Sequence, residues 1–490
     1  MKHSYLAAIA AAAVISIAGG AGAFASASAP TPSPSAAPHT VPTAVHGLEH
    51  VASSGIATSA TGGAYLLKDF MPGSDSGGPG GPMAKLGSYV YFDAQTPEDG
   101  DELWKSGGTT ATTKLIRDID PGIDSSVPSD PVTAGKYVYF RAWDGTHGGE
   151  LWRSDGSAAG TTLVADINPG AGDSTPTNLL AVGSELYFQA NDGTHGTELW
   201  KSDGTAAGTE MIRDLNQGSG SGAGNYPMVA IGGTVYFQGN DGVHGAEPWE
   251  TQGSAGTTQL IADIYSGASG SLPSGFTVYK GSVYFQAGTS TDSYQLWVAN
   301  GANAAEVRQI NSSGTAFPSD LVATSKYLYF NATDGATHGY ELWRSDGTFT
   351  GTQMVKDINP GAGFSQPGEI VALGNEIYFH ASDGSYSDEL WKSDGTLPGT
   401  QLVKLFSTTS SSYPYGMLVI GSKVYFTGTD DANGRQLWVT GGTSSSTKLV
   451  VRIDGGLNGS SPAYLIANGG RLFFTATSGT YGMELWAYKY

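Results

Sequence analysis

A Glu-Leu-Trp string recurs along this chain every 46 to 49 residues, measured between its tryptophans. Six copies are complete and begin at Glu102, Glu150, Glu198, Glu341, Glu389 and Glu484. Variants begin at Glu247, Gln295 and Gln436, so the chain carries nine copies of one unit. A repeat of this length is typical of solenoids, propellers and other arrays, and it takes precedence over an estimate of domain number from chain length.

Each unit contains four short runs of β-type composition, separated by turn residues. In the third unit the runs cover residues 178–182, 185–190, 197–201 and 210–215. The pairs between them, Gly183-Ser184, Asp192-Gly193 and Asp203-Gly204, are typical of tight turns that join antiparallel strands. The unit is therefore predicted to be an antiparallel, four-stranded meander.

The second run of each unit carries two adjacent aromatic residues, such as Tyr187 and Phe188 in the third unit. Neighbouring side chains of a strand point to opposite faces, so both faces of each small sheet must be covered. Sheets that stack on one another cover both faces. The pattern predicts an all-β fold, a single β-propeller with four-stranded blades.

The ends of the repeat favour a closed ring over an open solenoid. The ninth unit stops after its third run, whereas residues 63–73 match residues 351–361, which hold the fourth run of the sixth unit. The sequence thus predicts nine blades, with the last blade closed by the N-terminal strand. Nine blades exceed the usual four to eight.

Residues 1–29 combine a short basic start, an apolar stretch and small residues for cleavage, which predicts a secretory signal peptide. Residues 30–60 are rich in Pro, Ser, Thr and Ala and are predicted to be a flexible tether. The propeller is expected to cover residues 61–490, without a membrane span, as a secreted, extracellular monomer. The net charge of −20 argues against nucleic acid as a partner, and the absence of cysteine excludes disulfides.

The units that begin at Glu198, Glu341 and Glu389 read ELWKSDGTAAGT, ELWRSDGTFTGT and ELWKSDGTLPGT. They resemble the bacterial ELWxxDGT repeat family, and the likeness covers nearly everything after the tether. Units one, four, five and eight replace the Ser-Asp-Gly part, for example by Ser106-Gly107-Gly108. The resemblance implies a repeat architecture in secreted or surface proteins, and it implies no particular biochemical activity.

Aspartates in turns and linkers are candidate metal ligands. In a propeller, the turns between the second and third strands lie on the same face as the linkers between blades, so their carboxylates come near one another. Carboxylate and carbonyl oxygens suit Ca²⁺ in an extracellular setting, and no other cofactor is expected. The candidate ligands are Asp144, Asp192, Asp241, Asp334, Asp166 and Asp214.

Four aromatic residues fall in loops between the predicted strands and not at core positions. Exposed rings offer flat apolar surface on which ligands, sugars among them, can stack. These candidate binding residues are Trp143, Tyr226, Tyr413 and Tyr415.

No residue is predicted to be catalytic. The Glu of Glu-Leu-Trp recurs in seven units and is Gln in two, as expected of a hydrogen-bond acceptor and not of a single catalytic acid. The inner strands, such as residues 179–182 and 370–373, carry small apolar residues. We therefore predict a non-catalytic binding or scaffold protein, not an enzyme, whose partners are extracellular proteins or polysaccharides. The alternatives are a glycan-active hydrolase or lyase with its site in the central funnel, and a surface or matrix component.

Overall fold

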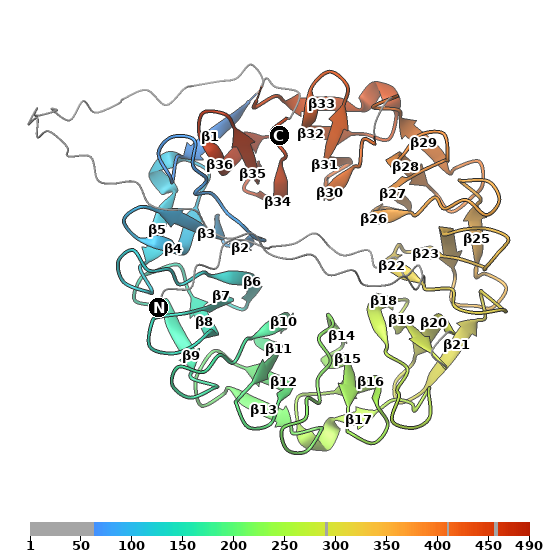
Figure 1. Cartoon of the computed structure of the whole chain (residues 1–490), viewed down its shortest axis with the longest axis horizontal. Coiled ribbons are helices and arrows are strands. Elements are labelled where there is room, and N and C mark those ends of the chain that lie inside the picture. Colours follow the sequence, from blue (N-terminus) through green and yellow to red (C-terminus); the bar gives the residue numbers. More distant parts are fainter. Residues whose placement is uncertain (1–62, 290–292, 409–410, 455–458) are drawn as a thin grey trace, which may run out of the picture. The chain divides into compact units, whose positions relative to one another are not determined.

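The computed structural model describes residues 63–289, 293–408, 411–454 and 459–490. These residues form nine four-stranded antiparallel sheets around a ring (Figure 1). The all-β, nine-bladed β-propeller predicted from the repeat is therefore confirmed. The predicted signal peptide and tether, residues 1–60, lie outside the described residues.

The strands of blades 1 to 8 follow the order of the chain from the inside of the ring outward (Figure 1). Blades 1 to 3 contain β2 (Ala84–Leu86), β3 (Tyr89–Thr96), β4 (Gly100–Ser106), β5 (Lys114–Arg117); β6 (Ser129–Ala134), β7 (Tyr137–Ala142), β8 (Glu150–Ser154), β9 (Thr162–Ala165); and β10 (Thr177–Val182), β11 (Glu185–Asn191), β12 (Thr197–Ser202), β13 (Glu210–Arg213). Blades 4 to 6 contain β14 (Val229–Ile231), β15 (Thr234–Asn240), β16 (Ala246–Thr251), β17 (Gln259–Leu260); β18 (Ser274–Tyr279), β19 (Ser282–Gly288), β20 (Tyr294–Ala299), β21 (Ala304–Arg308); and β22 (Ser319–Ala323), β23 (Leu328–Ala332), β24 (Glu341–Ser345), β25 (Gln353–Lys356). Blades 7 and 8 contain β26 (Gly368–Leu373), β27 (Glu376–Ala381), β28 (Glu389–Ser393), β29 (Gln401–Lys404); and β30 (Tyr415–Ile420), β31 (Lys423–Asp430), β32 (Gly434–Thr440), β33 (Lys448–Val451).

Blade 9 joins the two ends of the described chain. It contains β34 (Ala463–Asn468), β35 (Arg471–Ser478) and β36 (Gly482–Lys489), and β1 (Ala64–Lys68) supplies its outermost strand. β1 pairs antiparallel with β36, with Ala64 opposite Tyr488 and Leu66 opposite Trp486. The predicted closure of the last blade by the N-terminal strand is confirmed.

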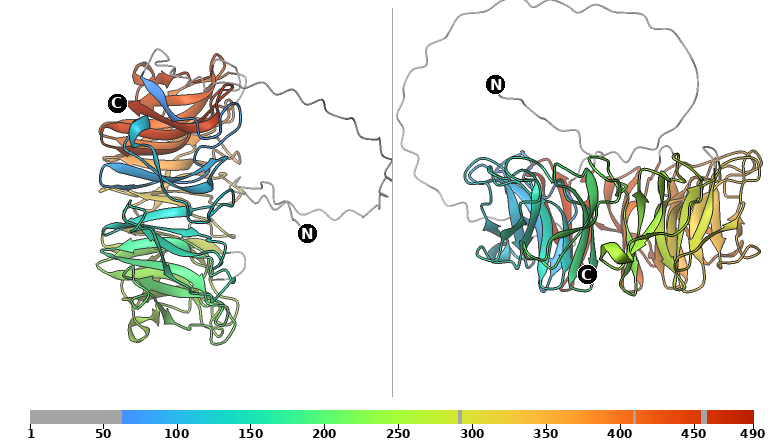
Figure 2. Two further views of the ribbon diagram at one scale, coloured as in Figure 1. Left: turned by 90° about the vertical axis from the view of Figure 1, so that its left-hand side faces the viewer. Right: turned by 90° about the horizontal axis from the view of Figure 1, so that it is seen from below.

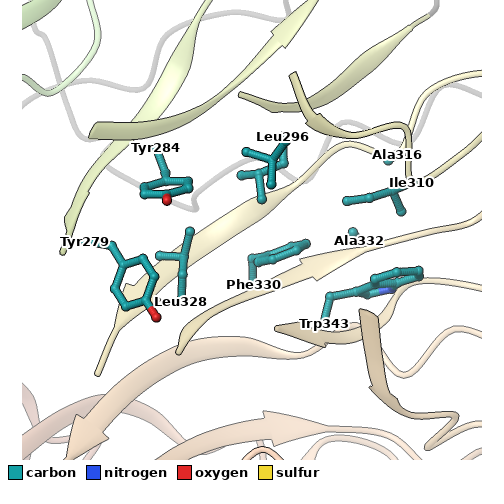
Figure 3. Close-up of a cluster of buried hydrophobic side chains, with 10 residues drawn as sticks. Tyr279, Tyr284, Leu296, Ile310, Ala316, Leu328, Phe330, Ala332 and Trp343 are labelled. Carbon is teal, nitrogen blue, oxygen red and sulfur yellow. The ribbon is translucent and has the colours of Figure 1, made fainter. Parts of the chain in front are cut away.

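An apolar cluster fills each junction between neighbouring blades. Figure 3 shows the junction of blades 5 and 6, where Tyr284 and Leu296 of blade 5 pack against Leu328, Phe330 and Trp343 of blade 6. None of these five side chains is more than 5% exposed. Burial of a large apolar side chain stabilises a fold by about 1.5 to 3 kcal/mol. The aromatic pair on each second strand therefore serves blade stacking, as its two-faced pattern predicts.

The Glu of each Glu-Leu-Trp string ties its blade to the linker that follows. Glu150 is fully buried and accepts hydrogen bonds from the amides of Ile167, Asn168 and Ser174 at 3.0, 3.1 and 3.1 Å. The Ser174 hydroxyl donates a fourth bond at 2.6 Å. In blade 5, Gln295 fills the same role, since its side-chain oxygen accepts from the amide of Ile310 at 2.8 Å. These glutamates thus hold the scaffold together.

The aspartate of the Ser-Asp-Gly turn holds the hairpin between the third and fourth strands. Asp203 Oδ1 accepts from the amide of Thr205 at 2.8 Å and from its hydroxyl at 2.7 Å. Blades 1, 4, 5 and 8 lack this aspartate, and in blades 1, 4 and 8 a one-turn 3-10 helix takes its place: η1 (Thr110–Thr112), η2 (Ala255–Thr257) and η3 (Ser444–Ser446). The departures from the repeat therefore alter a turn and leave the strands in place.

The linkers from each blade to the next lie on the same face of the ring as the hairpins between second and third strands. The amide of Trp143, at the end of β7, donates to the carbonyl of Ser126 in the preceding linker at 3.0 Å, and Asn191 makes the same bond to Ser174 at 2.9 Å. We call this side of the ring the linker face; Figure 2 shows the blades edge-on between the two faces. In the described part of the chain, no helix is long and apolar enough to cross a membrane.

Candidate functional site

Seven of the linkers present one residue in a strained backbone conformation, directly before a proline. These seven non-glycine residues have φ between 38 and 50°: Val127, Thr175, Leu272, Phe317, Gln366, Tyr413 and Ser461. Left-handed φ values of this kind cost about 1 to 3 kcal/mol each and cluster at functional sites. Their side chains differ from blade to blade, and Val127, Leu272, Phe317 and Tyr413 are 40 to 45% exposed. The linker face therefore carries the variable part of the repeat.

Trp143 anchors the most distinctive group on this face. It occupies the position at which blades 3 and 4 carry Asn191 and Asn240. Its indole Nε1 donates to Asp173 Oδ1 at 3.0 Å, and the amide of Gly149 donates to the same oxygen at 2.6 Å. The ring packs so closely on Gly149 that a Cβ there would lie 2.6 Å from it. Trp143 and Asp173 are thus fixed against each other.

A pocket of about 510 Å³ opens beside this group. Its walls come from the linker between blades 1 and 2, the hairpin between β7 and β8, and the linker between blades 2 and 3. The lining residues are Asp120, Ser125, Val127, Trp143, Gly145, Thr146, His147, Gly148, Ala171 and Asp173. A few polar groups around an apolar wall are typical of small-ligand sites.

Asp120 gives the pocket an unusual electrostatic character. At this linker position Asn168 and Asn359 each donate from Nδ2 to a carbonyl five residues further on, at 3.0 Å. The Asp120 carboxylate has no hydrogen to donate in that way. Burial, followed by repulsion from Asp124, Asp144 and Asp118, raises the pKa of Asp120. Asp120 therefore lies among like charges.

Two of the other predicted aromatic residues meet at the junction of blades 7 and 8. The rings of Tyr413 and Tyr415 lie 6.5 Å apart, and the Tyr413 ring lies 5.3 Å from the His380 imidazole. The guanidinium of Arg435 lies 4.9 Å from the centre of the Tyr415 ring. Tyr226 is 45% exposed on the linker between blades 3 and 4, and no ring contact in the described part of the chain joins it to either group.

The predicted calcium ligands lie on the linker face, but four of them pair with histidines. Oδ2 of Asp144, Asp192, Asp241 and Asp334 lies 2.6 to 2.9 Å from Nδ1 of His147, His195, His244 and His338. Asp166 and Asp214 accept from the amides of Gly170 and Gly218 at 3.2 and 3.3 Å. Among the described residues, no three His, Asp or Glu side chains are arranged to hold a metal ion. Calcium binding stays a prediction.

Reasoning from the sequence missed several residues of these groups. Arg141, whose guanidinium lies 4.9 Å from the centre of the Trp143 ring, and His380 both follow the aromatic pair of the second strand. Asp120 and Asp173 stand in linkers, and Arg435 precedes the Gln of Gln-Leu-Trp. The sequence feature that marks such residues is a residue type that varies from blade to blade at one fixed position of the repeat. The residue after the aromatic pair is Asp93, Arg141, Gln189, Asn331, His380 or Thr427 in different blades, while its neighbours hardly change.

No protein-family model and no curated protein matches the sequence. Among solved structures, the chain is similar to a puromycin-hydrolysing peptidase of Mycobacterium tuberculosis, at 10% identity over 81% of this chain and 57% of that chain, with a TM-score of 0.42. It is also similar to prolyl oligopeptidase B from Galerina marginata, at 10% identity over 66% of this chain and 50% of that chain, with a TM-score of 0.42. A prolyl endopeptidase matches at 9% identity over 66% and 49% of the two chains, with a TM-score of 0.41. The chain spans about half the length of these proteins, and the likeness is one of fold.

These findings correct the predicted function. The predicted function, a binding or scaffold protein for extracellular protein or polysaccharide partners, is corrected by these comparisons, in which the solved structures of similar fold are peptidases. The predictions that the chain is not an enzyme, is secreted, is a monomer and belongs to the ELWxxDGT family stay predictions.

Proposed function

We propose that the propeller recognises peptides, and that the pocket beside Trp143 binds a cationic group, which is a lysine or arginine side chain or a peptide N-terminus. One observation carries the proposal: Asp120, Trp143 and Asp173, three departures from the repeat, come together on the walls of a single pocket. This is one site for a small charged group, and not a set of repeated contacts to a large partner. Peptidases are also the solved proteins that share the fold.

The chemistry of the walls fits an organic cation with an apolar stem. Hydrogen bonds from a charged donor to a carboxylate contribute about 1.5 to 3 kcal/mol. Val127, Ala171 and the Trp143 ring offer apolar surface for the methylene groups of a lysine or arginine side chain. The Asp120 carboxylate, close to other negative charges, gains most from a positive ligand.

Calorimetric titration with two blocked tripeptides tests the proposal. Acetyl-Ala-Lys-Ala-amide carries the cation, and acetyl-Ala-norleucine-Ala-amide replaces it by a neutral chain of similar length. We expect the lysine peptide to bind at least about tenfold more tightly, which corresponds to about 1.4 kcal/mol. Equal binding of the two peptides, or binding of neither, would contradict the proposal.

Two variants separate binding from folding. Asp120→Asn installs the residue that donates across the linker in blade 2, where Asn168 Nδ2 bonds to the Asp173 carbonyl at 3.0 Å. It should therefore fold at least as well as the wild type while losing affinity for the lysine peptide. Trp143→Asn copies blade 3, and Asn191→Ala in blade 3 is the matched control that should leave affinity unchanged. Unchanged affinity of Asp120→Asn would remove the pocket from the proposal.

A further inference from the structure

A second group of non-repeated side chains lies at the junction of blades 7 and 8. Tyr413 lies between His380 and Tyr415, with ring centres 5.3 and 6.5 Å away. The Arg435 guanidinium carbon lies 4.9 Å from the centre of Tyr415 and 6.0 Å from that of Tyr413. A guanidinium at these distances from two aromatic rings gains cation-π stabilisation. We call these four residues the Arg435 group.

At this junction a large residue on one strand lies opposite a small residue on the paired strand, which leaves space for the Arg435 group. His380 pairs with Gly368 across β26 and β27, and a Cβ at Gly368 would lie 2.6 Å from His380 Nε2. In the next blade the sizes are reversed, because Tyr415 on β30 pairs with Thr427 on β31. The two adjacent blades are therefore adapted together, which a purely structural repeat does not require.

Hydrogen bonds fix the aromatic platform and the backbone of Arg435. The Tyr415 hydroxyl donates to the carbonyl of Pro462 at 3.2 Å, and the Tyr413 amide donates to the carbonyl of Asp388 at 3.0 Å. The Arg435 carbonyl accepts from the amides of Ser460 and Ser461 at 2.8 and 3.2 Å. A guanidinium over such a platform loses less conformational entropy when it binds a ligand.

The charge of Arg435 has no counter-charge in the described part of the chain, where no carboxylate lies within 4.0 Å of its guanidinium. The carboxylate of Asp388 lies 3.6 Å from His380 Nδ1. Other basic residues have structural partners: Arg117 and Arg213 donate to the carbonyls of Thr161 and Thr258 of the next blade at 2.7 and 3.0 Å. Arg435 makes no such bond among the described residues, although the chain as a whole is strongly acidic.

We propose that Arg435, held over Tyr413 and Tyr415, is a binding site for a carboxylate group. A planar guanidinium stacks on aromatic faces and still offers N–H groups in the geometry of a carboxylate. The carboxylate comes either from a peptide C-terminus or from an Asp or Glu side chain of the ligand. This site stands on its own residues and does not require the pocket beside Trp143 to bind a cation.

Three blocked peptides identify the group that binds. Acetyl-Ala-Phe-Ala with a free C-terminus is compared with its amide and with acetyl-Ala-Glu-Ala-amide, by calorimetric titration of the full chain. Binding of the free acid alone identifies a C-terminal carboxylate, whereas binding of the Glu peptide identifies an acidic side chain. We expect the acid that binds to do so about tenfold or more tightly than the neutral amide. Equal binding of all three peptides, or binding of none, overturns the proposal.

Variants assign the effect to Arg435. Arg435→Gln should abolish the preference for the acid, and Tyr415→Leu should weaken it, whereas Tyr415→Phe keeps the ring. Arg344→Gln is the matched control, because Arg344 also lies over a tyrosine, 4.2 Å from the centre of Tyr327. A preference that survives Arg435→Gln in a protein with an unchanged melting temperature sinks the assignment. Asp120→Asn and Trp143→Asn should leave the preference intact, so that failure of one site is distinguished from failure of the other.

Discussion

Leu66 of β1 pairs with Trp486 of β36, which joins the first strand of the described chain to the last. The same strand contributes Leu67 to the apolar cluster between blades 9 and 1, where it packs together with Phe70, Phe92 and Trp104. The ring is therefore sealed by main-chain pairing and by side-chain packing at one place. Opening this seam would expose the apolar faces of two blades.

Leu67→Ala should destabilise the whole ring. Leu67 is 1% exposed, and removal of a buried leucine side chain costs about 2 to 5 kcal/mol. Deletion of residues 64–70 should lower the melting temperature further, because it removes the strand itself. Thermal unfolding followed by circular dichroism checks both variants, with Leu397→Ala as the control, since Leu397 is 63% exposed. If Leu67→Ala and the deletion variant both have the melting temperature of the wild type, a stabilising role for this closure is excluded.

Glu484→Gln should stabilise the protein at alkaline pH. Burial, together with the charge of Asp69, raises the pKa of Glu484 from its ordinary value of 4.5 to about 8. The folded state therefore binds this proton more tightly than the unfolded chain, and the stability that the proton gives is lost as the pH rises from 4.5 to 8. Glutamine does not ionise, so the variant should gain about 1 to 3 kcal/mol over the wild type at pH above 8 and little at acidic pH.

Comparison with Glu150→Gln tests whether the raised pKa of Glu484 is the cause of the alkaline effect. Glu484 Oε1 accepts from the amides of Met71 and Gly77 at 3.4 and 3.3 Å, whereas its buried Oε2 has no hydrogen-bond partner in the part of the chain that the structure describes. An amide nitrogen in place of that oxygen breaks no hydrogen bond. Both oxygens of Glu150 accept hydrogen bonds, so Glu150→Gln should destabilise the fold at every pH, by about 1 to 3 kcal/mol. Urea unfolding at several pH values separates the two variants, and parallel pH profiles for both would refute the explanation.

Asp192→Asn should lower the pKa of His195. The hydrogen bond from His195 Nδ1 to Asp192 Oδ2, 2.6 Å long, raises the pKa of His195 above its ordinary value of 6.5. The protonated pair stabilises the loop below pH 6.5, and this contribution is lost as the pH rises through the raised pKa. NMR titration of the imidazole signals should show a lower pKa for His195 in the variant than in the wild type, and an unchanged pKa for His147. An unaltered His195 titration would show that Asp192 is not the cause.

Calcium should raise the melting temperature if the linker aspartates bind it, as the sequence predicts. Asp214 Oδ2 accepts from the Gly218 amide at 3.3 Å, while its buried Oδ1 has no hydrogen-bond partner among the described residues. A ligand at 100 times its Kd stabilises a fold by about 2.7 kcal/mol. Thermal melts with millimolar calcium and with chelator measure the shift, and Asp214→Asn should reduce it. Identical melts in the two buffers would contradict the prediction.

The fold could be predicted from the sequence because every blade repeats the same physical requirements. The aromatic pair such as Tyr187 and Phe188 needs two covered faces, the Glu of Glu-Leu-Trp needs linker amides, and the matching run at residues 63–73 needs an unpaired strand. Each requirement is local and periodic, so it is visible without coordinates. With nine copies, the pattern also stays recognisable where a single blade departs from it.

The candidate sites were only partly predictable, because they are built from departures that lie far apart in the sequence. Trp143 and Tyr413 stand out as aromatic residues in loops, but their partners do not. Asp120 reaches the Trp143 pocket from the preceding linker, and His380 reaches Tyr413 from the preceding blade. The contacts between them depend on how the strands of neighbouring blades are aligned in the ring. The repeat pattern does not determine that alignment.

The left-handed residues before the linker prolines allow the linker face to vary in evolution while the fold is kept. Seven positions share one backbone conformation and display seven different side chains, including the β-branched Val127 and Thr175. The backbone conformation is the same whichever side chain stands there, and neighbouring hydrogen bonds such as that from the Tyr413 amide to the Asp388 carbonyl hold it in place. Substitutions at these seven positions, whether they arise in evolution or in a designed library, can therefore change the side chains that the linker face presents one blade at a time. The strands and their hydrogen bonds stay the same.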